Sequence, residues 1–150
     1  MQQSALVFMR GDQIYVVGQS RTTDGYWTDS DPYLTLPATV SSDELGAAVQ
    51  QTLRASRVGV APPANSTEKA VRSPLLRMAR VRTWSTFARQ ATMVGLVSDG
   101  ETITVVRYHR VRGGFAPLPS RLPSQVDARD VGSLGDKLFG ALQRDLALAA

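Results

Sequence analysis

The feature that most constrains the fold is an internal repeat, which appears when residues 5–56 are laid over residues 94–145 without a gap. At this offset of 89 positions, glycines, acidic residues and β-branched residues recur in the same order. The matched pairs include Gly11 with Gly100, Ile14 with Ile103, Val16 with Val105, Gly25 with Gly114, Tyr26 with Phe115, and Gly46 with Gly135. Such an ordered series predicts two copies of one structural unit within the chain.

Each copy has the pattern of a β-hairpin followed by an extended segment. An apolar run ("ALVFM" or "TMVGLV") meets a short polar turn ("RGDQ" or "SDGE"), and a second β-rich run follows ("IYVVGQS" or "ITVVRYHRV"). Val, Ile and Tyr favour strands, and a turn glycine permits positive φ. A glycine and an aromatic residue come next, then a segment that contains proline.

A helix is expected to close each copy. In the first copy, Ser41 and Glu44 have the spacing of a capping box, and apolar residues then recur every fourth position. In the second copy, apolar residues recur in the same way on one helical face. Both faces are predicted to pack on the sheet through Leu45, Val49 and Leu53 in the first helix and Val131, Leu134, Leu138 and Leu142 in the second.

The segment between the copies is predicted to be largely helical. Ser73 and Pro74 look like an N-cap and a first helical residue for "LLRMARV", and "TWSTFARQA" suggests a further helical turn that leads into the next strand. The expected fold class is therefore α/β (α+β), with an antiparallel sheet built from two repeated hairpin–helix units, at about 5–56 and 94–145, and a linking helical segment. We expect residues 1–150 to form a single domain with an internal duplication.

The stretch "RYHRVRGGF" at residues 107–115 raises the question of an Arg-Gly-Gly nucleic-acid segment. Its counterpart in the first copy ends in "TTDGY", which is acidic, so the copies share only a β run followed by a glycine and a ring. This favours a strand running into a turn. His109 lies in that alternating run and is expected to be exposed or half-buried.

The composition argues against several chemistries. The 150 residues include no cysteine and one histidine, which excludes thiolate chemistry and any metal site built from two histidines of one chain. No P-loop, G-x-G-x-x-G or G-x-S-x-G pattern occurs. We therefore expect no enzyme activity, no cofactor and no metal. No signal peptide or membrane span is evident, and a cytoplasmic location is expected.

Charge is distributed unevenly and gives two candidate binding surfaces. Residues 1–53 hold two basic and six acidic side chains, whereas residues 54–90 hold eight basic and one acidic. One candidate is the acidic and aromatic stretch with Asp24, Trp27, Asp29, Asp31 and Tyr33, which suits a cationic partner. The other suits an acidic partner and contains Arg72, Arg77, Arg80 and Arg82. An equal alternative is that Tyr26 and Trp27 belong to the core, with Tyr26 the more buried because Phe115 is its counterpart.

Residues 84–142 resemble the immunity proteins of bacterial contact-dependent growth inhibition systems, the CdiI-like family. The residues that carry the resemblance are Trp84 and Phe87 before a strand, Gly113 to Phe115 after a hairpin, and Leu134 with Gly135 in the terminal helix. The resemblance implies a non-catalytic protein that binds the C-terminal toxin domain of a cognate effector, often a nuclease, in a one-to-one complex. No contact residue can be carried over, because these vary with the toxin.

Two other classes remain open from the sequence. A nucleic-acid-binding module would use the arginine-rich middle segment and would lose affinity steeply with salt. A structural or chaperone-like subunit of a secretion apparatus would self-assemble or bind many partners. An immunity protein should instead bind one toxin tightly, and no direct contact with nucleic acid or membrane is then expected.

Overall fold

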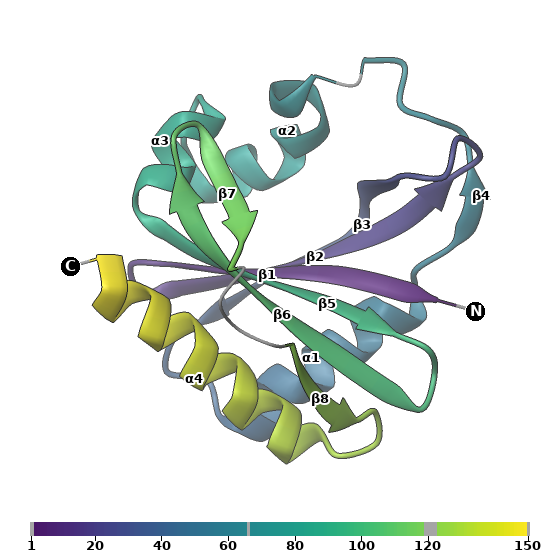
Figure 1. Ribbon diagram of the computed structural model, residues 1–150. Coiled ribbons are helices and arrows are strands. Elements are labelled where there is room, and N and C mark those ends of the chain that lie inside the picture. The colour runs from purple at the N-terminus through teal and green to yellow at the C-terminus, as the bar shows by residue number, and fades with distance from the viewer. Residues whose placement is uncertain (1, 66, 119–122, 150) are drawn as a thin grey trace.

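The computed structural model describes residues 2–65, 67–118 and 123–149. These form a mixed α/β fold with one eight-stranded sheet, whose main order is β3-β2-β1-β5-β6-β7 (Figure 1). All of its pairs are antiparallel except β2 with β4. The strands are β1 (Gln3–Arg10), β2 (Gln13–Thr22), β3 (Trp27–Pro37), β4 (Val58–Val60), β5 (Ala91–Ser98), β6 (Thr102–Val111), β7 (Gly114–Pro117) and β8 (Ser124–Asp127). The helices are α1 (Ser42–Arg54), α2 (Glu68–Ala79), α3 (Trp84–Arg89) and α4 (Val131–Ala149).

The two predicted hairpins are present as β1–β2 and β5–β6. Gly11 and Gly100 sit in the turns with φ of 61° and 100°, a conformation that favours glycine. In the second turn the carboxylate of Asp99 accepts hydrogen bonds from the backbone N–H groups of Glu101 and Thr102, at 2.9 and 2.8 Å. The local sequence therefore specifies both turns.

The hairpins share one register and meet at the centre of the sheet. Leu6 pairs with Val17 in the first hairpin, and Gly95 pairs with Val106 in the second. Both pairs follow the offset found in the sequence. Strands β1 and β5 then pair antiparallel with Leu6 opposite Gly95, its own counterpart. Two copies related by a two-fold axis would give this pairing, although the duplication itself stays a prediction.

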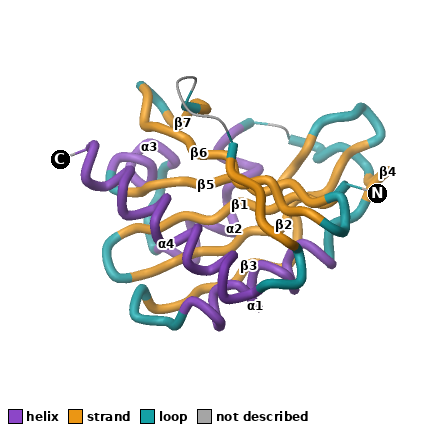
Figure 2. The backbone as a smooth tube through the Cα atoms, turned by 60° about the horizontal axis from the view of Figure 1, so that its bottom comes forward, coloured by secondary structure: helices purple, strands orange, loops and turns teal. Residues whose placement is uncertain are grey.

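Helices α1 and α4 cover one face of the sheet side by side (Figures 1 and 2). They approach through glycines, because a Cβ atom at Gly46 would overlap the Val131 carbonyl and one at Gly135 would overlap the Ser42 carbonyl. The predicted cap is confirmed, since the Ser41 hydroxyl accepts the N–H of Glu44 at 3.1 Å. Of the helix residues predicted to pack on the sheet, Val131 is half-buried and the others are buried: Leu45, Val49, Leu53, Leu134, Leu138 and Leu142.

The linking segment supplies α2 and α3, which lie over the opposite face of the sheet (Figure 1). The predicted start of α2 at Pro74 is wrong. The helix begins at Glu68 with Thr67 as its N-cap, and Pro74 lies inside it. A proline inside a helix removes one backbone hydrogen bond, so the sequence signal for a helix start was misleading here. The further helical turn is confirmed as α3, which runs into β5.

The chain after each hairpin differs between the halves. Strand β3 is continuous along β2 with one register shift between Val17 and Gly18, whereas β6 is paired by two short strands, β7 and β8. The stretch at residues 107–115 is the end of β6, a turn with Gly113 at φ 83°, and the start of β7. The strand-and-turn interpretation is therefore confirmed, and His109 is half-buried on β6 as expected. None of the described helices is long and apolar enough to span a bilayer.

Candidate functional site

A concave surface lies on the sheet face opposite α1 and α4. Helices α2 and α3 cover only part of this face, and the remainder is an open groove of about 350 Å³. We call it the sheet groove. Its lining comes from six strands and two helices: Ser4, Leu6, Gln19, Trp27, Arg72, Trp84, Met93, Gly95, Leu96, Val97, Val106, Tyr108 and Phe115.

One wall of the sheet groove is aromatic and is fixed by the core beneath it. Thr83 caps α3 by accepting the N–H of Thr86 at 3.1 Å, so Trp84 begins the helix. The Trp84 ring contacts Phe115 edge-on at 5.8 Å between centroids and stacks on Phe87 at 5.6 Å. Aromatic pairs in this geometry are more stable than their buried area alone would give. The Trp84 ring is therefore held between Phe87 and Phe115.

The other side of the sheet groove is a chain of hydrogen bonds across three strands. The Ser4 hydroxyl donates to Gln19 Oε1 at 2.9 Å, and Gln19 Nε2 donates to Asp29 Oδ1 at 3.3 Å. Arg72 of α2 then donates from one nitrogen to both oxygens of Asp29, at 2.7 and 2.9 Å. The polar side chains on this side therefore contact one another, and they tie α2 to the sheet.

The Arg72–Asp29 ion pair is buried. The Asp29 side chain is 1% exposed and that of Arg72 is 14% exposed. The guanidinium also lies 4.9 Å from the centroid of the Trp84 ring, within the range of a cation–π contact. Sequence analysis placed these two residues on alternative surfaces, for partners of opposite charge. In the structure they neutralise each other.

Tyr33 on β3 lies beside the same pair. Burial, followed by the negative charges of Asp29 and Asp31, raises the pKa of the Tyr33 hydroxyl to about 12, against the smaller opposing effects of Arg72 and Arg77. Both burial and nearby carboxylates disfavour the phenolate. The structure therefore brings Asp29, Asp31, Tyr33, Arg72 and Arg77 together where α2 meets β3.

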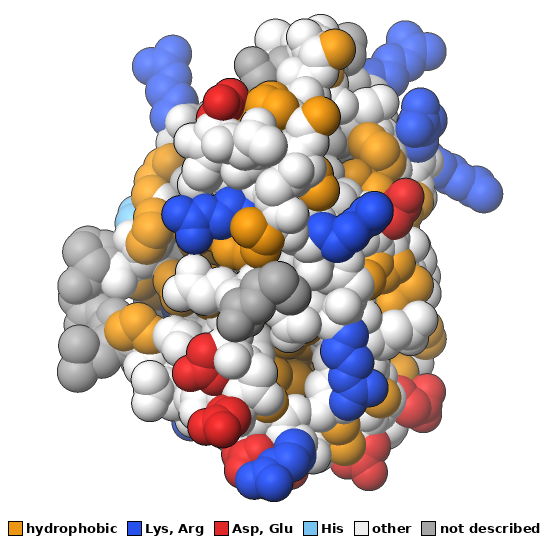
Figure 3. Space-filling view, turned by 90° about the vertical axis from the view of Figure 1, so that its right-hand side faces the viewer, with side chains coloured by type: hydrophobic (Ala, Val, Ile, Leu, Met, Phe, Trp, Pro, Cys, Tyr) orange, Lys and Arg blue, Asp and Glu red, His pale blue; other side chains and the backbone are white. Residues whose placement is uncertain are grey.

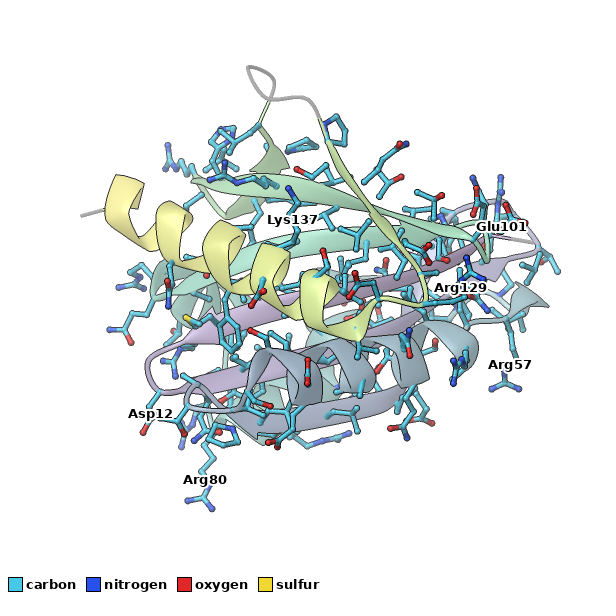
Figure 4. The ribbon with its side chains drawn as sticks, turned by 90° about the horizontal axis from the view of Figure 1, so that it is seen from below. Asp12, Arg57, Arg80, Glu101, Arg129 and Lys137 are labelled. Atoms are coloured by element: carbon cyan, nitrogen blue, oxygen red, sulfur yellow. The ribbon has the colours of Figure 1, made fainter. Side chains whose placement is uncertain are left out.

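The remaining predicted residues are distributed differently. Trp27 is half-buried and lines the sheet groove, whereas Asp24 is exposed in the β2–β3 turn. Arg80 and Arg82 are exposed in the link between α2 and α3. Figure 4 shows Arg80 projecting into solvent at the end of the molecule where Asp12 also lies.

The expectation that Tyr26 is buried is wrong, because its side chain is 42% exposed. Its counterpart Phe115 packs against the core under α2 and α3. The equivalence fails because no helix of the first half covers the β2–β3 turn in the way that α3 covers β7. An offset between two sequences cannot report what packs on each copy from outside the repeat.

Several groove residues were not identified from the sequence. Gly95 forms part of the floor, where a Cβ atom would lie 2.9 Å from the Tyr108 ring. A glycine inside a strand is a recognised sign of close approach, and this signal could have drawn attention to the floor. Ser4 and Gln19 carried no comparable signal. Among the described residues, no group of three or more His, Cys, Asp or Glu side chains could hold a metal ion.

Surface composition around the sheet groove is mixed. In Figure 3, hydrophobic side chains are visible at the surface between Lys and Arg side chains, while Asp and Glu gather toward the lower part, the side that α1 and α4 cover. A groove with one aromatic wall and one side of satisfied polar groups suits recognition of another molecule.

No family model and no curated protein sequence matches the chain. Two solved structures have a similar fold. One is a protein of unknown function from Neisseria meningitidis, with a TM-score of 0.78, 16% sequence identity, and coverage of 96% of this chain and 95% of the other. The second is a chain of the CdiA-CT/CdiI toxin and immunity complex from Yersinia pseudotuberculosis, with a TM-score of 0.75, 15% identity, and coverage of 96% and 97%. At these identities the similarity establishes the fold alone.

Proposed function

We propose that this chain is a CdiI-like immunity protein, which binds and neutralises the C-terminal toxin domain of a cognate contact-dependent growth inhibition effector. The observation that carries the proposal is the fold, which matches a chain of a toxin and immunity complex over almost the whole length of both chains. The resemblance of residues 84–142 to that family supports it independently. The protein would act in the cytoplasm, as a one-to-one complex and without catalysis.

The sheet groove is the contact surface that we propose for the toxin. Its aromatic wall is preformed, and half-buried Trp27 and Tyr108 lie at its margins. Aromatic side chains in such positions commonly dominate binding energy at protein interfaces. Among the described residues that line it, Arg72 is the one cation, and it pairs with Asp29. An uncharged, apolar or aromatic side chain projecting from the toxin is therefore the occupant that suits it.

The residues where α2 meets β3 would extend this contact. Asp31 and Arg77 are exposed on either side of half-buried Tyr33. Charges at the margin of an interface mainly influence association rate and choice of partner. They would help this protein to distinguish its toxin from related toxins. A nuclease is the toxin class that we propose, in line with the family.

Co-expression tests the proposal. The C-terminal domain of the effector encoded directly upstream would be expressed with and without this protein, and growth and co-purification would be followed. We expect growth to recover and a one-to-one complex to survive high salt. Toxicity that this protein does not relieve would contradict the proposal. Salt-sensitive binding of nucleic acid in its place would favour the alternative module.

A matched pair of variants tests the contact surface. Val97→Arg introduces a long charged side chain into the sheet groove, whereas Val58→Arg makes the same change on β4, where Val58 is 52% exposed. Val97 is half-buried beside an open groove and Val58 is exposed, so both proteins should fold, which a thermal unfolding curve of each variant checks. We expect rescue to fail with Val97→Arg alone. Equal rescue by the two variants would exclude the sheet groove as the contact surface.

A further inference from the structure

A second hollow of about 170 Å³ lies on the other side of the wall formed by α3 and β7. Arg89, Arg110 and Arg112 line it from the end of α3, the end of β6 and the β6–β7 turn. We call it the arginine hollow. The rest of its lining is neutral: Ser85, Ala88, Val111, Gly113 and Gly114. All three guanidinium-bearing side chains are exposed.

The fold, and not the local sequence, brings these three arginines together. Gly114 lies so close to α3 that a Cβ atom there would approach Trp84 Nε1 to 3.2 Å. This close packing places the β6–β7 turn beside the end of α3. Arg110 is held in position because its guanidinium donates a hydrogen bond to the backbone carbonyl of Arg89. A helix C-terminus carries partial negative charge, which stabilises a cation there.

No counter-charge for the arginine hollow is found in the part of the chain that the structure describes. Among the residues that the structure describes, none of its three arginines forms an ion pair, and no carboxylate lines it. Three like charges around one hollow repel each other, and an incoming anionic group would relieve that repulsion.

The arginine hollow and the sheet groove are neighbours. Trp84 and Phe115 face the sheet groove, while the adjacent residues Ser85 and Gly114 line the arginine hollow. One protein could therefore contact both surfaces across the α3–β7 wall. A stable protein interface typically buries about 800 Å² on each partner, an area that extends beyond one such groove.

We infer that Arg89, Arg110 and Arg112 form a second contact for the toxin and receive a segment that carries Asp or Glu side chains. The inference rests on the proposed function. Guanidinium groups bind carboxylates through paired hydrogen bonds, which gives direction as well as charge. A protein segment suits the hollow better than a nucleic acid strand, because the nearest rings, Trp84 and Phe115, pack into the core and are not free for base stacking.

Association kinetics with the purified toxin domain test this inference. The variant Arg89→Ala/Arg110→Ala/Arg112→Ala is compared with Arg54→Ala/Arg57→Ala/Arg129→Ala, which removes the same charge from exposed positions elsewhere. We expect the first variant to lower the association rate at low salt about tenfold and to weaken its salt dependence. The control variant should stay within about twofold of wild type.

The outcomes separate the two proposals. If wild type does not bind the toxin domain, both the proposed function and this inference fail. If wild type binds and the hollow variant has the same rate and salt dependence, this inference alone fails. A single-stranded oligonucleotide of mixed sequence serves as a second probe. If the oligonucleotide binds wild type but not the hollow variant, the arginine hollow would be assigned to nucleic acid. That result would overturn the proposal of an acidic protein segment.

Replacing Arg110 removes its hydrogen bond to the Arg89 carbonyl, so the triple variant could be less stable than wild type. Arg112→Glu is a second variant that avoids this change. Arg112 is exposed in a turn, so its replacement should leave the unfolding midpoint unchanged. Reversal of its charge should nevertheless slow association. If Arg112→Glu and wild type associate at the same rate, the arginine hollow does not face the toxin.

Discussion

The two faces of the sheet are covered in different ways. On one face, α1 and α4 lie in contact along their lengths and bury residues from β1, β2, β5 and β6 under them. On the other face, α2 and α3 cover the half around Phe8 and leave the half around Leu6 and Gly95 as the sheet groove. We call these the closed face and the open face. Since both are made by the same strands, the covering helices determine which face keeps an open groove.

The origin of the helices explains this difference. Each half of the chain supplies one helix to the closed face, and the pair meets through Gly46 and Gly135, which are equivalent in the repeat. The open face is covered only in part, by α2 and α3, and both helices come from the single linking segment. One segment cannot cover both halves of the sheet equally. The comparison teaches that a single linking segment can leave part of one sheet face uncovered while two helices cover the other face.

The largest expected effect comes from a cavity under the closed face. Leu138→Ala should lower the free energy of unfolding by about 3 kcal/mol, because Leu138 is fully buried between α4 and the sheet. Val97→Ala on the open face should cost less than about 1 kcal/mol. Urea denaturation of both variants measures the contrast. Equal losses would mean that the faces do not differ in packing.

Removal of one partner of the buried ion pair should have the next largest effect. Asp29→Ala removes the carboxylate that pairs with Arg72, and we expect a loss of about 2 kcal/mol, less than for a fully buried pair because Arg72 is 14% exposed. Asp29→Ala/Arg72→Met should recover part of the loss. A double variant that is less stable than Asp29→Ala in chemical denaturation would contradict this account of α2 attachment.

A smaller effect is expected from filling the groove floor. Gly95→Ala places a methyl group against the flexible side chain of Tyr108, which can rotate toward the groove. Stability should change by less than about 1 kcal/mol, whereas the toxin affinity should fall about tenfold. Calorimetric titration with the toxin domain measures this affinity, and urea denaturation measures the stability. Unchanged affinity would mean that the floor stays empty in the complex.

The smallest effect concerns pH. The pKa of Tyr33 is raised from 10.0 to about 12, so the folded state keeps its phenol protonated where the unfolded chain would lose the proton. Its contribution to stability is complete below pH 10 and is lost as the pH rises toward 12. Tyr33→Phe should flatten this decline in alkaline denaturation. An identical alkaline profile for the variant would contradict the burial of Tyr33 beside Asp29.

The local sequence was sufficient to predict those elements that depend on residues close together in the chain. The turns at Gly11 and Gly100, the cap at Ser41 and the apolar helix positions follow from short-range rules, and all are present. The start of α2 was missed because Pro74 satisfies the rule for a first helical position yet lies inside the helix. Residues at the cap, Thr67 and Asn65, gave a weaker signal than Ser73-Pro74.

The candidate site was harder to predict because it depends on distant contacts. Asp29 and Arg72 are 43 positions apart, and only the packing of α2 on β3 turns two opposite surface charges into one buried pair. The contact between Arg89 and Arg110 could not be predicted either, because the two residues lie 21 positions apart in different elements. Patterns predict where charges lie along a strand or helix, but not which element will neutralise them.

Hydrogen–deuterium exchange with and without the toxin domain tests the central claim that the open face binds the partner. Backbone amides become protected where a partner excludes water or stabilises a strand. We predict added protection in β5, β6, β7 and α3, with α1 and α4 unchanged. Protection confined to α1 and α4 would contradict the account and assign binding to the closed face.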